Sequence, residues 1–363
     1  MIELVALNRQ YQRYKLDIDR QIKEVLDSAS FIMGAKVEEL ERLLSGYVGT
    51  KFAIGCSSGT DALLLALMAY GVGEDDEIIT TPFTFISTAE VISFLKARVV
   101  FVDIDSQTFN IDPAKIEAAI TEHTRGIIAV DIFGQCAEYD YINSIAAKYS
   151  LFVIEDAAQS FGAKYKGRRS CSLADVACTS FFPAKPFGCY GDGGMVFTDN
   201  EEIANVIYSL RGHGKGTHKY DNIRIGLNAR LDTIQAAVLL AKFPYFQNEL
   251  DGRNRIAEVY TERLKSKVMV PIIEGHNFSA FAQYCIRFEK RDDLHSYLKE
   301  RGIHTAIFYP KPLHLQRAFA YLEYSLGDFP VAEEVSRDIL ALPIHPFLSL
   351  EEQDEIIEAI LSF

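Results

Sequence analysis

The sequence predicts an α/β fold, with a large domain on a mostly parallel seven-stranded sheet and a smaller C-terminal α+β domain. Three observations favour it. Between residues 51 and 199, short apolar runs alternate with helix-length segments, as expected of strands that helices cover on both faces. The chain has 363 residues, enough for two or three domains. After Pro271 the pattern changes to a strand followed by amphipathic helices.

The elements expected before residue 223 follow from the spacing of apolar residues and from local composition. Two amphipathic helices are expected first, at 9–28 and 36–46. Residues 211–222 are rich in Gly, His and Lys and predict a long polar loop. The strands of the large sheet are predicted where apolar and β-branched residues cluster, at 52–54, 77–80, 99–102, 126–130, 151–154, 176–180 and 195–198.

The C-terminal third is predicted to begin near Pro244, between two helical patterns. The expected domains are therefore 1–244 and 245–363, with the option that the N-terminal helices pack on the smaller one. The elements expected here are helices at 231–242 and 247–265, a strand at 281–289, a helix at 292–301, a Pro-rich loop at 309–314 and a closing helix at 350–361.

Composition excludes several classes of protein. The 37 basic and 50 acidic residues give a net charge of −13, so no nucleic-acid partner is expected. Six cysteines without a C-x-x-C pair indicate reduced thiols and a cytoplasmic location. No leader-like segment is visible, and the most apolar stretch, 62–69, is far shorter than the ~20 residues of a membrane span. We expect neither export nor a membrane.

Residues after two of the predicted strands are suited to bind a phosphate group and a planar ring. Residues 57–61 (SSGTD) follow the first strand and begin a helix, where free amides, Gly59 and the Thr60 hydroxyl favour an anion site. A helix N-cap without a ligand is the alternative interpretation. After the second strand, Phe85 is placed to stack on a ring, although Phe83 and Phe85 are equally compatible with the core.

A carboxylate and a lysine follow two further strands. Asp156 ends an apolar strand, where burial is costly unless it meets a cation. The eight histidines are dispersed and offer no convincing metal ligands, so an organic cation such as a protonated pyridine nitrogen fits better. Lys185 lies between two prolines among aromatic residues. A solvated surface lysine is the common alternative, but apolar surroundings favour the neutral amine that Schiff-base chemistry requires.

Residues 226–232 (GLNARLD) are interpreted by themselves as a helix start with Asp232 as its cap. The other four segments together are the parts needed to hold pyridoxal 5'-phosphate, with Lys185 placed 29 residues after Asp156.

With these segments, the sequence resembles the DegT/StrS family of sugar aminotransferases, of fold type I. The runs SSGTDALLLAL, TTPFTFIST, IEDAAQSFGA, SFFPAKPFGCYGDGG and GLNARLDTIQAA carry the resemblance. Within the family, FFPAKPFGCYGDGG is most similar to enzymes of the WbpE type, which aminate a UDP-linked 3-keto sugar uronic acid. The resemblance implies transamination with L-glutamate as donor and 2-oxoglutarate as its product, in the biosynthesis of polysaccharide or glycan precursors.

The resemblance also implies roles for single residues. Lys185 forms the Schiff base and moves the proton, and Asp156 keeps the pyridine nitrogen protonated. The other implied cofactor contacts are Gly59, Thr60 and Ser180 to the phosphate, Gln159 beside the ring and Phe85 on its face.

A homodimer with shared active sites is implied as well. In the family, Asn228, counted among the cofactor contacts, and Arg230 reach into the neighbouring subunit's site. The candidate positive groups for binding a nucleotide-linked sugar are Arg230, Lys215 and the loop 311–314, including His314. Tyr309 matches the family, whereas Phe308 stands where relatives often have His.

Two alternatives remain beside the aminotransferase. Sugar 3-dehydratases of the same fold replace the Schiff-base lysine by histidine, so Lys185 argues against that class. A non-catalytic regulatory module that binds pyridoxal phosphate would usually lose Lys185 or Asp156, and both are present.

Overall fold

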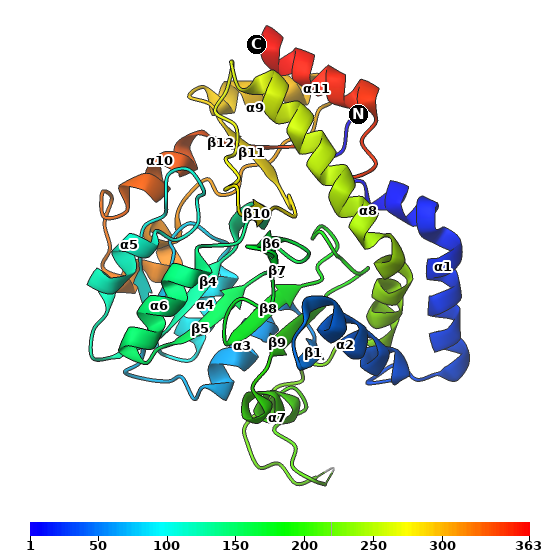
Figure 1. Ribbon diagram of the computed structural model, residues 1–363, viewed down its shortest axis with the longest axis vertical. Helices are drawn as coiled ribbons and strands as arrows, with labels where there is room; N and C mark the ends of the chain where they lie inside the picture. The colour runs from blue at the N-terminus through cyan, green and yellow to red at the C-terminus, as the bar shows by residue number, and fades with distance from the viewer. Residues whose placement is uncertain (219) are drawn as a thin grey trace.

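A computed structural model describes residues 1–218 and 220–363 (Figure 1). Its centre is a seven-stranded sheet in the order β1-β9-β8-β5-β4-β2-β3. Strands β2, β3, β4, β5 and β8 are parallel, while β9 pairs antiparallel with β8 and β1. The mostly parallel sheet is thereby confirmed. Its strands are β1 Phe52–Cys56, β2 Glu77–Thr80, β3 Arg98–Phe101, β4 Thr124–Val130, β5 Phe152–Asp156, β8 Val176–Ser180 and β9 Gly194–Thr198.

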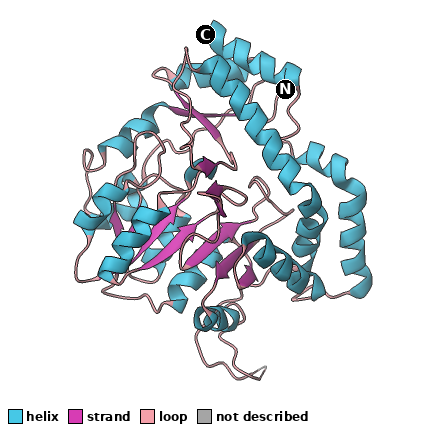
Figure 2. Cartoon of the chain, viewed as in Figure 1, coloured by secondary structure: helices cyan, strands magenta, loops and turns pink. Residues whose placement is uncertain are grey.

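Helices cover both faces of this sheet (Figure 2). Consecutive strand residues point to opposite faces, and both are buried: Ile128 belongs to the core on one side and Ile127 to the core on the other. This double burial is why the strands show apolar runs without alternation. One core includes residues of α3 Gly59–Ala69, α4 Ser87–Phe94 and α7 Glu201–Leu210, and the other those of α2 Ala35–Val48, α6 Tyr139–Tyr149 and α8 Thr233–Leu264.

Helix α8 is continuous, so the two helices expected on either side of Pro244 were wrong. An interior proline costs about 3 kcal/mol of helix stability. Here apolar residues on both sides of it, such as Leu239 and Leu250, are fully buried and hold the helix through that point. The domain boundary near Pro244 stays a prediction. Helix α1, Leu7–Ser28, packs along α8, and Arg9 Nη1 donates to Glu352 Oε2 at 2.7 Å.

The C-terminal part has its own core around a two-stranded sheet. Strand β11, helix α9 and helix α11 lie where a strand and two helices were expected; β12, α10 and two short 3-10 turns were not expected. Their bounds are β11 Tyr284–Arg287, α9 Arg291–Glu300, η3 Leu313–Leu315, η4 Arg317–Leu322, α10 Pro330–Asp338, β12 Ile339–Leu342 and α11 Leu350–Ser362.

The remaining elements are short: α5 Pro113–Ile116, η1 Glu117–Ala119, η2 Ile132–Gly134, and the small sheet of β6 Lys164–Tyr165, β7 Arg168–Arg169 and β10 Asn277–Phe278. Across the described ranges, every helix is too short or too polar to span a bilayer.

Two carboxyl groups are fully buried beneath the sheet edge at which β4 and β5 end. Asp131 Oδ1 accepts from Ala137 N and Tyr139 Oη, both at 2.9 Å, and Oδ2 accepts from Ser160 Oγ at 2.7 Å. Burial raises the pKa of Asp131 to about 6, and burial together with the neighbouring Asp131 charge raises the pKa of Glu155. The pair therefore favours holding a proton at mildly acidic pH.

Replacing Asp131 by Asn tests this burial. The folded pKa lies above the ordinary value, so the stabilisation from this group is full below pH 3.8 and is lost as pH rises through about 6. An amide cannot ionise and does not suffer this loss. We expect the urea midpoint of Asp131→Asn, relative to wild type, to rise between about pH 4 and about pH 7, by an equivalent of up to about 3 kcal/mol. The exposed Asp75→Asn is the control; parallel pH profiles for wild type and Asp131→Asn would contradict the prediction.

Candidate active site

The turn after β1 lies directly against the end of β8. A Cβ on Gly59 would lie 2.7 Å from the Cβ of Ser180, so only glycine permits this approach. Ser58 is the N-cap of α3, its side chain accepting from Asp61 N at 3.0 Å. The N-cap interpretation is therefore correct for Ser58. It leaves Gly59, Thr60 and Ser180 gathered at the start of an 11-residue helix, where an anion is favoured.

Asp156 is the last residue of β5 and is buried. Its Oδ2 accepts from Thr88 Oγ1 at 2.8 Å and its Oδ1 accepts from Ala158 N at 3.3 Å. Burial raises its pKa, against the effect of these hydrogen bonds and of the positive charge of Lys185. A carboxylate in this position favours a cationic partner.

Lys185 is partly buried in the loop between β8 and β9 and interacts electrostatically with Asp156. Burial lowers the pKa of its amine, which Asp156 partly offsets. Among the residues that the structure describes, the Nζ atom has no hydrogen-bond partner. These surroundings favour the neutral, nucleophilic amine and not a solvated surface lysine.

Two side chains of helix α8 form hydrogen bonds with the backbone of this loop. Gln235 Oε1 accepts from Tyr190 N at 2.9 Å, and Lys242 Nζ donates to the carbonyl of Gly188. The two residues are seven positions apart and so lie on one helix face. Lys242 is buried, which lowers its pKa to about 8. Neither residue was predicted to belong to the site, although a lysine inside an apolar helix pattern was a signal for Lys242.

Aromatic and amide side chains complete the site. Phe85 is 55% exposed and its ring centroid lies 6.4 Å from that of Tyr309, whereas Phe83 is fully buried. The core interpretation was thus wrong for Phe85 and right for Phe83. Gln159 Oε1 accepts from Phe133 N at 2.7 Å, and its Nε2 donates to Tyr309 Oη at 3.3 Å. These bonds fix the amide next to the Tyr309 hydroxyl.

Three predicted residues lie on a separate loop between α7 and α8. Figure 1 shows this loop extending away from the body below α7. Arg230 Nη2 donates to Asn228 Oδ1 at 2.5 Å, and Asn228 and Lys215 are exposed. Residue 219 of the predicted polar loop lies outside the described residues. Asp232 occupies the N-cap position of α8 without a side-chain cap hydrogen bond, so its predicted capping role was wrong.

His314 does not face this site. Its imidazole has no exposed surface, its Nε2 lies 3.0 Å from Glu333 Oε1, and its ring packs edge-on against Phe329. Burial lowers its pKa and favours the neutral ring. The prediction of a substrate contact at His314 was wrong, because the apolar packing of the 3-10 turn η3 turns the side chain inward.

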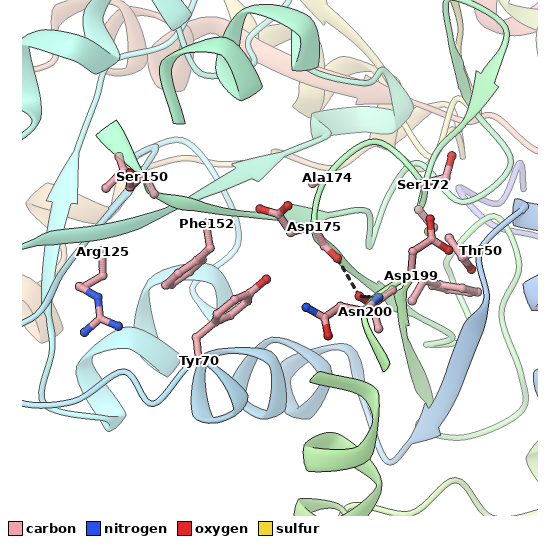
Figure 3. Close-up of a pocket in the computed structure, with 14 residues that line it drawn as sticks. Thr50, Tyr70, Arg125, Ser150, Phe152, Ser172, Ala174, Asp175, Asp199 and Asn200 are labelled. Atoms are coloured by element: carbon pink, nitrogen blue, oxygen red, sulfur yellow. Dashed lines mark hydrogen bonds between the residues drawn. The ribbon is translucent and has the colours of Figure 1, made fainter. Parts of the chain in front are cut away.

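A cavity of about 620 Å³ lies at the opposite edge of the sheet, where β5 begins (Figure 3). Tyr70 stacks on Phe152 there, with ring centroids 4.0 Å apart. Two carboxylates that line the cavity bind backbone amides: Asp175 Oδ2 accepts from Val153 N, and Asp199 Oδ1 accepts from Lys51 N. The cavity holds none of the predicted site residues. Nor do the described residues contain a group of three or more His, Cys, Asp or Glu side chains suited to a metal.

Comparison with known proteins agrees with this geometry. Residues 13–361 match the DegT/DnrJ/EryC1/StrS aminotransferase family. The chain belongs to this family. It is 48% identical to the UDP-2-acetamido-2-deoxy-3-oxo-D-glucuronate aminotransferase of Pseudomonas aeruginosa, over 96% of each chain.

Solved structures also match nearly the whole chain. An aminotransferase of this family from Brucella abortus matches with a TM-score of 0.97 and 44% identity, over 100% of this chain and 99% of that one. NtdA of Bacillus subtilis with bound cofactor PMP matches with a TM-score of 0.91 and 32% identity, over 96% and 82%. The fold is thus fold type I, the chain is an aminotransferase, and its cofactor is pyridoxal 5'-phosphate.

The residues present fit this cofactor. Glycine at position 59 lets the start of α3 lie directly against Ser180, so that helix amides and the hydroxyls of Thr60 and Ser180 gather at one point, as a phosphate site requires. The buried Asp156 offers a carboxylate to the ring nitrogen, and Lys185 offers an amine of lowered pKa.

Gly59→Ala tests the close approach to Ser180. The added methyl must displace Ser180, and overpacking of this kind costs about 1–3 kcal/mol. We expect the dissociation constant for pyridoxal 5'-phosphate, measured by fluorescence titration of the apoprotein, to rise about tenfold or more. Affinity for pyridoxal, which lacks the phosphate, should change little. Gly46→Ala, where a Cβ meets no atom within 4 Å, is the matched control; an equal loss for both ligands would show general distortion instead.

Proposed function

We propose that this chain transfers the amino group of L-glutamate to the keto group of a UDP-linked 3-keto sugar. The observation that carries the proposal is the partly buried Lys185 in electrostatic interaction with the buried Asp156: burial lowers the pKa of the amine, and the carboxylate favours a cation. The relative from Pseudomonas aeruginosa, a UDP-3-oxo-sugar aminotransferase by name, supports the substrate class. With both residues in place, a sugar dehydratase or a non-catalytic regulatory module is not favoured.

Lys185 does the proton chemistry in this proposal. Burial keeps a share of its amine neutral, so Nζ can act as nucleophile toward the cofactor aldehyde. As a free amine it accepts the proton that leaves the amino-bearing carbon of the donor and returns a proton to the sugar carbon. When bound, pyridoxal phosphate supplies the electron sink for that carbon.

The other residues bind and orient. Asp156 holds a proton on the ring nitrogen through its buried carboxylate, and the start of α3 binds the phosphate with Gly59, Thr60 and Ser180. Phe85, whose ring is exposed, would cover one face of the cofactor. Gln159, whose amide oxygen accepts from Phe133 N, would lie beside the cofactor ring.

The substrate contacts are proposed from charge and position. In a chain of net charge −13, a pyrophosphate and a sugar carboxylate need local cations. Arg230 and Lys215, both in the segment between α7 and α8, provide them, and Tyr309 offers a hydroxyl next to Gln159.

The functional unit in this proposal is a homodimer in which Asn228 and Arg230 serve the partner's site, Asn228 at the cofactor. Exposed large apolar side chains in two segments support it, one beside the pairing of Ile32 with Asp232 and the other in the loop between α7 and α8. Exposed apolar side chains of this size favour burial against another chain. The exposed residues are Phe31 at 44%, Ile32 at 48%, Ile223 at 57% and Ile225 at 91%.

The proposed compartment is the cytoplasm. All six cysteines are free thiols, and all are buried. A reducing compartment keeps them so.

The substrate class is tested by running the reaction in reverse. UDP-, dTDP- and GDP-linked amino sugars are each supplied with 2-oxoglutarate, and glutamate formation is measured. We expect UDP-linked 3-amino sugars to react with kcat/KM at least about tenfold above the others. Lys185→Ala should lose nearly all turnover, since the nucleophile and proton carrier are both removed. Equal rates for all nucleotides would refute the UDP preference, and an active Lys185→Ala would refute the mechanism.

Shared active sites are tested by complementation. An Arg230→Ala chain and a Lys185→Ala chain are co-expressed with different tags, and the heterodimer is purified. If Arg230 serves the partner, one site of the heterodimer carries both defects and the other is intact, because two-fold symmetry repeats every contact. Nearly inactive parents should then give about half the wild-type rate per dimer. A heterodimer no more active than its parents would place Arg230 at its own chain's site or outside catalysis.

A further inference from the structure

The segment that follows β2 presents three successive groups to the cofactor site. Phe85 is exposed toward Tyr309, Ser87 Oγ lies 2.7 Å from Thr60 Oγ1, and Thr88 Oγ1 donates to Asp156 Oδ2 at 2.8 Å. Thr88 is 1% exposed. One short segment therefore contacts Tyr309, the turn that begins α3 and the carboxylate of Asp156.

The proton of the Thr88 hydroxyl has a defined direction. A hydroxyl has a single proton, and Thr88 gives its proton to Asp156. The contact of 3.1 Å between Thr84 Oγ1 and Thr88 Oγ1 must then be donated by Thr84, which is also buried. The result is a directed chain from Thr84 through Thr88 to Asp156.

We infer that Thr88 is a positioning residue that holds the Asp156 carboxylate, through its Oδ2 atom, in place for the pyridine nitrogen. The inference rests on the proposed function, since it needs Asp156 to face that nitrogen. Ala158 N fixes the other oxygen, Oδ1. With both oxygens bonded, rotation of the carboxylate would break a buried hydrogen bond.

Electrostatics act in the same direction. Burial raises the pKa of Asp156, while the hydrogen bond from Thr88 lowers it. Without that donor the buried carboxyl group would favour its protonated form more strongly and would hold the pyridine proton less well.

The experiment compares two probes on the apoprotein: pyridoxal 5'-phosphate and its 1-deaza analogue, in which CH replaces the ring nitrogen. Both can reach Lys185 and the phosphate site, but only the first can use Asp156. The variants are Thr88→Val, which keeps the shape and removes the hydroxyl, and Thr88→Ser, which keeps the hydroxyl. Thr84→Val removes only the preceding donor, and Asp156→Asn is the reference for loss of the contact.

We expect Thr88→Val to weaken pyridoxal 5'-phosphate binding about tenfold, the size of a lost hydrogen bond to a charged group. Binding of the 1-deaza analogue should stay at the wild-type value. Thr88→Ser should restore the preference for the natural cofactor, and Thr84→Val should show a smaller loss than Thr88→Val. Steady-state kinetics of the loaded Thr88→Val enzyme should show a lower kcat with little change in the KM for the amino sugar.

Three results would overturn the inference. An equal loss of affinity for both probes in Thr88→Val would indicate a structural role alone and would overturn it. Unchanged affinities for both probes in Thr88→Val would overturn it as well. A wild-type chain that binds both probes with equal affinity would overturn it together with the proposed role of Asp156. The first two results leave the proposed function standing, so the two failures are distinguishable.

Discussion

Desolvation of charge at the carboxyl edge of the sheet is the constraint on which the site depends. Asp156 ends β5 and is buried, and Lys185, in the loop after the neighbouring strand β8, is partly buried and interacts electrostatically with it. In that setting each group shifts toward its neutral form, which is unfavourable for an ordinary ion pair and suitable for a site that receives a cationic ring and offers a free amine. The hydrogen bonds of Thr88 and Ala158 keep the carboxylate available.

Close packing around the site imposes a second constraint. The turn after β1 approaches both β8 and β9, and a Cβ on Gly194 would lie 2.3 Å from the carbonyl oxygen of Ser58. Gly59 and Gly194 thus let three strands bring their ends together without side chains between them. Gly194, in the glycine-rich sequence after Lys185, serves contact between backbones, and this contact brings Ser180 to the start of α3.

The sequence was informative where chemistry and local pattern coincide. The strands of the large sheet were predictable because double burial gives apolar runs, and Lys185 and Asp156 stood out because charged residues are rare at such strand ends. Thr88, Gln235 and Lys242 could not be assigned, since their roles depend on partners 45 to 68 residues away in the chain. His314 and Pro244 misled for a related reason. Tertiary packing turned the histidine inward and carried the helix through the proline.

Helix α8 is a rigid connection between the two halves of the chain. Its first half holds the loop of Lys185 through Gln235 and Lys242, and its second half packs against α11 and the C-terminal core. A rotation of the C-terminal core would therefore also move the loop that carries Lys185. Bending of the helix at Pro244, where a backbone hydrogen bond is already missing, would absorb part of that motion. The position of that proline determines how far motion at one end is felt at the other.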